Sequence, residues 1–255
     1  MKLDRRQLIV GTCACCLAPG APAIAEKFSP RTGCVVRGKE AARALGSGIL
    51  GSTLDELPDL VKQRSRTTGN HDLNKQLDAA LQRIAKTFNV WPQVGFYDDG
   101  KHPNAIAIWY EEAGKRTYAV VFGKNYFTKL LTYDPSGITF LQTAAHEFAH
   151  VWMYKTGQLD SLLENQPTVK RAELHADFLA GYYLGLRKRD NPQASFRSAG
   201  MKRWESGDTY FDNQHHHGTP KQRLAAAEKG FRMGYLEGAK PDAAFEAATR
   251  FVKTI

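Results

Sequence analysis

The stretch SGITFLQTAAHEFAHVWMYKTG, residues 136–157, decides the fold. Apolar side chains surround it on nearly every side and Gly157 closes it, which predicts a long buried helix. His146, Glu147 and His150 lie within this helix. Residues four apart share a helix face, so both imidazoles can bind one ion while Glu147 lies beside it. The alternative is a buried helix with two hydrogen-bonded histidines, although burying these three polar groups without a metal is unfavourable.

A third metal ligand is expected on the next predicted helix, residues 169–189. Catalytic zinc takes three protein ligands and keeps one position open for water. Glu173 follows His150 by 23 residues, and Asp177 lies four residues later on the same helix face. We expect Glu173 to complete the metal site and Asp177 to accept the remaining N–H of a ligating histidine. His175 points away from this face, which predicts a structural or surface histidine and not a ligand.

The remaining pattern predicts an α+β fold that is mainly helical. Short apolar runs predict a small antiparallel or mixed sheet, arranged as a meander of about three strands at 94–97, 104–110 and 117–122. Apolar periodicity predicts further helices at 72–88, 126–132, 219–230 and 242–252. The sheet therefore precedes the two helices that carry the polar motifs.

The first 25 residues predict a secretory signal. Arg5 and Arg6 precede a short apolar run, and Ala25 ends an A-x-A cleavage site. The arginine pair resembles a twin-arginine signal, with an ordinary secretory signal as the alternative. We therefore expect export to the periplasm or the medium. The expected organisation is a signal at 1–25, a flexible lead-in at 26–70 with a short helix near 39–45, and one domain at 71–255.

Charge and cysteine content limit the partners and the disulfides that we expect for the mature chain. The formal net charge of +9 falls to +7 without residues 1–25, because three basic residues and one acidic residue are removed. Only Cys34 of the four cysteines remains, which excludes an internal disulfide. The basic surplus is compatible with peripheral contact with anionic envelope surfaces, and a soluble basic protein without such a partner is the alternative. No nucleic-acid partner and no transmembrane segment are expected, because the sequence contains no motif for the first and no apolar run long enough for the second.

The pairing of His146-Glu147-x-x-His150 with Glu173-x-x-Ala176-Asp177 resembles the gluzincin zinc metallopeptidases. Within that group the pairing is similar to the minigluzincins and to the bacterial neutral zinc metallopeptidase family. The resemblance implies one zinc ion bound by the two histidines and Glu173. It also implies that Glu147 is the general base, and that the domain hydrolyses peptide bonds in proteins or peptides.

Two other segments carry the same resemblance. Residues 104–107 resemble the strand that precedes the active-site helix in minigluzincins, which implies that an extended peptide binds to Asn104, Ala105, Ile106 and Ala107. Residues 217–223 resemble the His-then-Arg motif that follows the third ligand. His217 is therefore expected to stabilise the oxyanion, with Tyr210 as the alternative. Arg223 is expected to form a structural ion pair, and His215 and His216 to belong to a polar loop.

Two other functions are compatible with these motifs. The chain would be a non-enzymatic envelope binding protein if a fourth protein ligand, such as His217, closed the zinc site. It would be a cell-wall amide hydrolase if its basic surface recruited it to peptidoglycan. The number of protein ligands around the metal distinguishes the first of these from a peptidase.

Overall fold

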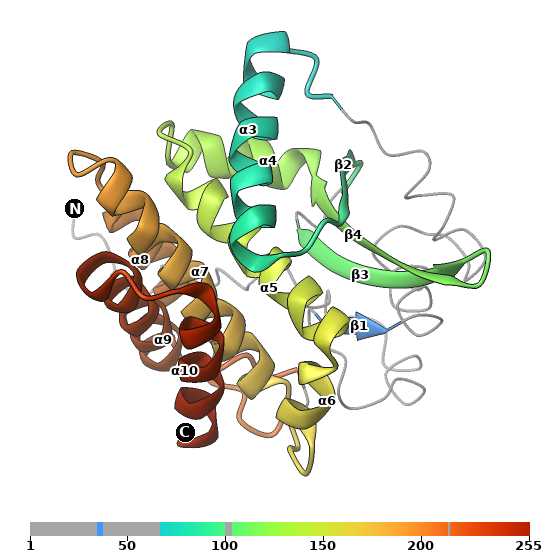
Figure 1. Ribbon diagram of the computed structural model, residues 1–255, viewed down its shortest axis with the longest axis vertical. Helices are drawn as coiled ribbons and strands as arrows, with labels where there is room; N and C mark the ends of the chain where they lie inside the picture. The colour runs from blue at the N-terminus through green and yellow to red at the C-terminus, as the bar shows by residue number, and fades with distance from the viewer. Residues whose placement is uncertain (1–34, 38–66, 100–103, 214) are drawn as a thin grey trace, which may run out of the picture.

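The computed structural model describes residues 35–37, 67–99, 104–213 and 215–255. The predicted signal at 1–25 and the helical candidate at 39–45 lie outside the described residues. Figure 1 shows helix α5 running through the middle of the molecule, with the sheet on one side and the C-terminal helices on the other. The predicted α+β, mainly helical fold is confirmed. Among the helices of the described segments, none combines the length and the apolar character of a membrane-spanning helix.

The sheet is mixed and has the strand order β1-β3-β4-β2. Strands β3 and β4 are antiparallel and joined by a tight turn with positive φ at Ala113 and Gly114. Strand β2 pairs with β4 in parallel, and β1 pairs with β3 in parallel. The strand bounds are β1 (Val35–Arg37), β2 (Gln93–Tyr97), β3 (Ala105–Glu112) and β4 (Lys115–Gly123). The predicted meander order was therefore wrong, since β2 lies beside β4 and not beside β3.

Asp99 explains why β2 pairs with β4. It follows β2 and accepts hydrogen bonds from the backbone N–H groups of Asn125 and Tyr126, at 2.9 Å each. These two residues open α4 (Lys124–Tyr133), the helix that directly follows β4. The carboxylate thus ties the ends of β2 and β4 to the same edge, which requires parallel strands. Gly123 makes room for it, because a Cβ there would lie 1.9 Å from Asp99 Oδ2.

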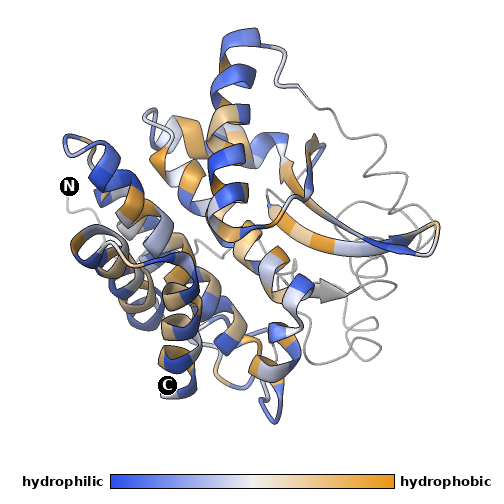
Figure 2. Ribbon diagram, in the orientation of Figure 1, coloured by the Kyte–Doolittle hydropathy of each residue, from blue (hydrophilic) through white to orange (hydrophobic). Residues whose placement is uncertain are grey.

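The helices agree with the predicted ones within a few residues where a prediction was made. Their bounds are α3 (His71–Phe88), α5 (Ile138–Thr156), α6 (Gln158–Leu163), α7 (Lys170–Asp190), α8 (Arg197–Glu205), α9 (Pro220–Arg232), η4 (Met233–Glu237) and α10 (Pro241–Lys253). Helices α6 and α8 and the π-helical turn η4 were not predicted. Figure 2 shows hydrophilic residues on the outer side of α3 and apolar residues on β3 and β4, except towards the tip of their hairpin.

Helices α5 and α7 form the buried centre and pack against each other. Helix α7 is also in backbone contact with α9 and η4 along a glycine seam, which consists of Gly181, Gly185, Gly230 and Gly234. A Cβ on Gly230 would lie 1.8 Å from the carbonyl oxygen of Phe178, and one on Gly181 would lie 2.0 Å from that of Ala227. These approaches exclude any side chain at the seam. They bring α9, with Arg223 in its first turns, against the middle of α7.

Candidate metal centre

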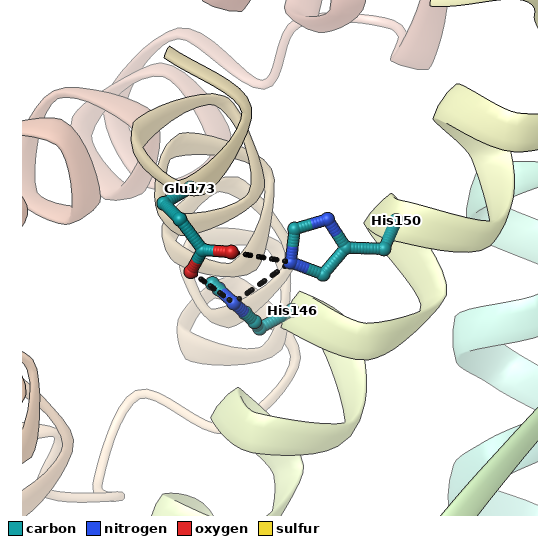
Figure 3. A group of neighbouring side chains, drawn as sticks. All are labelled: His146, His150 and Glu173. Carbon is teal, nitrogen blue, oxygen red and sulfur yellow. Dashed lines mark hydrogen bonds and ion pairs between the residues drawn. The ribbon is translucent and has the colours of Figure 1, made fainter. Parts of the chain in front are cut away.

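Helices α5 and α7 bring His146, His150 and Glu173 together (Figure 3). The Nε2 atoms of the two histidines are 3.1 Å apart. Glu173 Oε2 lies 3.4 Å from His146 Nε2, and Glu173 Oε1 lies 3.5 Å from His150 Nε2. One ligand atom from each residue lies within 4.8 Å of the others. The cluster therefore can hold a metal ion, and it consists of the three ligands expected from the sequence.

The cluster is buried and its polar atoms lack ordinary partners. Glu173 and His150 have side chains that are 0% exposed. Within the described chain neither carboxylate oxygen of Glu173, nor Nδ1 of His150, has a hydrogen-bond partner. A buried carboxylate without hydrogen bonds is strongly unfavourable, whereas a cation between the three side chains would satisfy it. The residues present thus fit a metal ion better than a structural histidine pair.

Asp177 orients one of the two histidines. Its Oδ1 atom lies 3.0 Å from His146 Nδ1, which leaves Nε2 facing the other two ligands. Two arginines hold the same carboxylate: Arg223 through Nε at 2.6 Å, and Arg203 through Nη1 at 2.9 Å. Burial acts to raise the pKa of Asp177, but Arg223 and Arg203 outweigh it and keep the pKa well below its ordinary value. Asp177 is therefore a fixed negative charge behind the ligand.

The electrostatics leave the ligand set ready for a cation. Burial lowers the pKa of His150 to about 3, so its imidazole is neutral at physiological pH. Burial also acts to lower the pKa of His146, but Asp177 and Glu173 outweigh it and raise the pKa. For Glu173, burial acts to raise the pKa, and the neighbouring histidines reverse that effect and lower it. A neutral imidazole beside a carboxylate is the form that binds a divalent metal.

Glu147 lies beside the ligands and takes no part in the cluster. It lines a small cavity together with His146 and Glu173. Its carboxyl group accepts a hydrogen bond from the backbone N–H of Ala107 in β3, while Oε2 has no partner among the described residues. Burial raises the pKa of Glu147 to about 8. A carboxyl group with a pKa in this range is suited to accept and release a proton near neutral pH.

His217 is held near the cluster by Asp208, a residue that the sequence analysis missed. The backbone N–H of His217 donates to Asp208 Oδ2 at 2.9 Å, and its Nδ1 lies 3.3 Å from the same oxygen. His217 is close enough to Glu173 to lower the pKa of that carboxyl group. His216 lies in the predicted loop before Thr219, where it binds the other oxygen of Asp208 and is 4% exposed. Tyr210, the alternative to His217, is 64% exposed.

Of the two arginines of the site, one was predicted from the sequence and the other was not. Arg223 forms the expected structural ion pair with Asp177 and also donates to the carbonyl of Ser206 at 3.1 Å. Arg203 was missed, because it lies on α8, which was not predicted. His175, expected to be either a structural or a surface residue, is fully buried on α7, with its ring 5.7 Å from the nearly parallel ring of Trp152.

The predicted substrate strand lies beside the cavity but differs from a simple exposed edge. Asn104 and Ala105 line the cavity, and residues 104–107 are all buried. The Ala107 carbonyl accepts a hydrogen bond from the hydroxyl of Tyr154 at 3.1 Å. Strand β1 pairs with residues 107–109, on the side of β3 away from β4. The edge of β3 at residues 107–109 is therefore already paired with the chain's own strand.

In comparisons with known proteins, no family model matches the chain, and neither a curated protein nor a solved structure matches it. The gluzincin resemblance of the motifs is therefore neither supported nor opposed by a relative. A function has to be argued from the chemistry of the buried cluster and of the cavity beside it.

Proposed function

We propose that this protein is an exported zinc-dependent metallopeptidase, with Glu147 as the general base. One observation carries the proposal. Two histidines from one helix and a glutamate from the next form a buried three-ligand cluster, and a carboxyl group that is not a ligand lines the same cavity. Three protein ligands leave a fourth position for water, which is the arrangement of catalytic zinc sites.

The donor set supports zinc over calcium and magnesium. Two imidazole nitrogens and one carboxylate oxygen form a set that zinc commonly accepts in hydrolases. Calcium and magnesium prefer a shell of oxygen ligands, and two of the three donors here are nitrogen. The buried Asp177 behind His146 is the kind of carboxylate that strengthens a zinc-binding histidine.

The chain's own residues account for the remaining steps. Zinc, when bound, would supply Lewis acidity and lower the pKa of a bound water molecule. Glu147 would accept a proton at its free carboxylate oxygen Oε2 from the water molecule that attacks the peptide carbonyl carbon, and would pass it to the amine nitrogen as the C–N bond breaks. His217, oriented by Asp208, would donate a hydrogen bond to the carbonyl oxygen of the cleaved bond.

Metal analysis of the purified protein, with a peptide-cleavage assay, tests the proposal. The wild type should contain about one zinc per chain and lose its activity to a chelator. Glu147→Gln should keep zinc and lose activity by about 10²–10⁴-fold, because proton transfer contributes that much. Glu164→Gln, at an exposed position, is the matched control and should behave as wild type. A Glu147→Gln variant that cleaves peptides as fast as the wild type would refute the mechanism.

The same purified protein distinguishes a peptidase from the two alternative functions. A structural zinc needs a fourth protein ligand, and the cluster found among the described residues has three. A cell-wall amide hydrolase would release fragments from purified peptidoglycan and leave casein intact. Export is tested by sequencing the N-terminus of the protein from the envelope fraction, which should begin after Ala25.

A further inference from the structure

We infer that the cavity beside the metal cluster binds a carboxylate of the substrate next to the cleaved bond, and that Arg203 selects it. This inference rests on the proposed peptidase function. It adds a preference for acidic over neutral and apolar substrates, which the metal cluster alone does not imply. Four features of the cavity carry it: its lining, its size, an unsatisfied arginine donor and its charge.

The lining of the cavity is polar beyond the metal ligands. Apart from His146, Glu147, Glu173 and the apolar Ala105, it is formed by Asn104, Tyr126, Thr143, Arg203, Ser206 and Arg223. All six side chains are polar: Asn104 precedes β3, Ser206 lies in the α8–α9 connection, and the other four lie on α4, α5, α8 and α9. A pocket for a leucine or phenylalanine side chain would be lined by apolar groups. This one would leave such a side chain against buried polar atoms, which is unfavourable.

The size of the cavity also excludes large apolar side chains. Its volume is about 20 Å³, slightly more than one water molecule requires. A carboxylate, with three heavy atoms, is larger than this space, so side chains of the lining have to move apart to admit it. Large apolar side chains are excluded by size as well as by the lining.

Arg203 provides a donor that the protein itself does not use. Its side chain is 5% exposed, and its Nη1 donates to Asp177 at 2.9 Å. Its Nε, however, is buried and has no hydrogen-bond partner in the described part of the chain. A guanidinium has five N–H donors, and leaving one buried and unsatisfied is unfavourable. An incoming carboxylate would satisfy it with a charge-assisted hydrogen bond.

The charge of the site favours an anion once the metal is bound. Arg203 binds the carboxylate of Asp177, and Arg223 binds that carboxylate and lies 3.5 Å from Glu173 Oε2. With a divalent ion present, the cation and the two arginines exceed the carboxylates of Asp177, Glu173 and Glu147 by one positive charge. In a buried site such a surplus attracts an anionic group and disfavours a second cation.

The carboxylate can come from two sources. It can be the side chain of aspartate or glutamate at either residue that flanks the cleaved bond, or the free C-terminus of a short substrate. Both present the same group to Arg203. A peptide set with aspartate, asparagine or leucine at each flanking position, and with a free or an amidated C-terminus, distinguishes them.

The test compares kcat/KM across this set for the zinc-loaded wild type, Arg203→Met and Lys202→Met. Aspartate, or the free C-terminus, should exceed its uncharged counterpart by about tenfold or more in the wild type. The ratio should fall to near one in Arg203→Met. It should be unchanged in Lys202→Met, which removes an equal charge from the neighbouring residue of the same helix. Equal rates for all peptides, or a ratio that survives in Arg203→Met, would overturn the inference.

A binding measurement separates this inference from the proposed function. If no peptide is cleaved, calorimetry with the α-amides of N-acetyl-aspartate and N-acetyl-asparagine, of which only the former carries a carboxylate, still reports on Arg203, with the former expected to bind about tenfold more tightly. Equal affinities would overturn the inference. If Arg203→Met does not fold, Arg203→Lys, which keeps the charge without the forked donors, replaces it. In that variant the preference for the carboxylate over its uncharged counterpart should fall at least threefold. An unchanged preference would show that Arg203 only positions Asp177.

Discussion

The Oδ1 atom of Asp177 lies 3.0 Å from Nδ1 of His146, and both side chains are buried. The same carboxylate also binds Arg203 and Arg223, so one residue joins a metal ligand to two elements that follow it in the chain. Helices α5, α7, α8 and α9 thus meet at a single carboxylate. The position of His146 depends on all four.

Asp177→Asn should weaken both the metal site and the fold. The amide cannot balance two buried guanidinium groups, so the free energy of unfolding should fall by about 3–5 kcal/mol. Loss of the carboxylate behind His146 should lower zinc affinity by about 10–100-fold. Chelator competition measures the affinity, and urea unfolding measures the stability. Asp190→Asn is the control, because it makes the same change at an exposed ion pair of the same helix. Zinc affinity equal to wild type would contradict the role assigned to Asp177.

Gly230→Ala should destabilise the protein through the glycine seam. The added Cβ would meet the carbonyl oxygen of Phe178, so α9 has to move away from α7. Overpacking of this kind costs about 1–3 kcal/mol or more. Gly200→Ala is a matched change in α8, where the new Cβ would meet only Leu224 Cδ1 at 3.7 Å. That variant should gain about 0.5–1 kcal/mol, because alanine is the better helix former. Thermal unfolding of the pair should show shifts of opposite sign.

Asp134 should make stability depend on pH in the acid range. Its carboxylate accepts hydrogen bonds from Ser136 and Thr139 at the start of α5. Partial burial acts to raise its pKa, but these hydrogen bonds outweigh it and hold the pKa below the ordinary value of 3.8. A carboxyl group whose pKa is lower in the folded state stabilises the fold above its unfolded pKa, and this contribution is lost as the pH falls below about 4.

Asp134→Asn therefore should be less stable than the wild type by about 1 kcal/mol at pH 7, as for loss of a helix cap. This difference in the free energy of unfolding should disappear between pH 4 and pH 2, which urea unfolding at each pH measures. Asp72→Asn, at an exposed position of α3, should show only a small gap throughout. A gap for Asp134→Asn that widens on acidification would contradict the sign of the pKa change.

Tyr182 and Tyr183 should respond differently to the loss of a hydroxyl group. Both are buried neighbours on α7. The hydroxyl of Tyr182 donates to the carbonyl of Ala239 at 2.7 Å, whereas that of Tyr183 has no hydrogen-bond partner in the described segments. Tyr182→Phe should cost about 1 kcal/mol, and Tyr183→Phe should be neutral or stabilising. Equal losses in thermal unfolding would show that Tyr183 has a partner.

The metal ligands were predictable because their chemistry follows local rules. His146 and His150 are four residues apart in a strongly apolar helix, and Glu173 and Asp177 repeat that spacing on the next helix. Helix periodicity alone places each pair on one face. Burial then makes a metal the simplest partner for the group, and the described cluster has this composition.

The rest of the site depends on contacts between distant segments, which no local pattern encodes. Arg203 reaches Asp177 across 26 residues from a helix whose apolar residues show little periodicity. Asp208 lies in a connection between helices, and the one available signal was an acidic residue shortly before His216 and His217. The strand order failed for the same reason, since the capping of α4 by Asp99 decides which strands pair.

The glycine seam also determines which parts of the molecule can move. Backbones that interlock at four positions can separate only by losing all of these contacts together, so α7, α9 and η4 form one rigid body. Glu173, Asp177 and Arg223 travel with that body and keep their mutual distances. The α8–α9 connection, which carries Asp208 and His217, lies outside this rigid body. A motion of that connection would change the distance of His217 from the cluster, while the distances among Glu173, Asp177 and Arg223 stay constant.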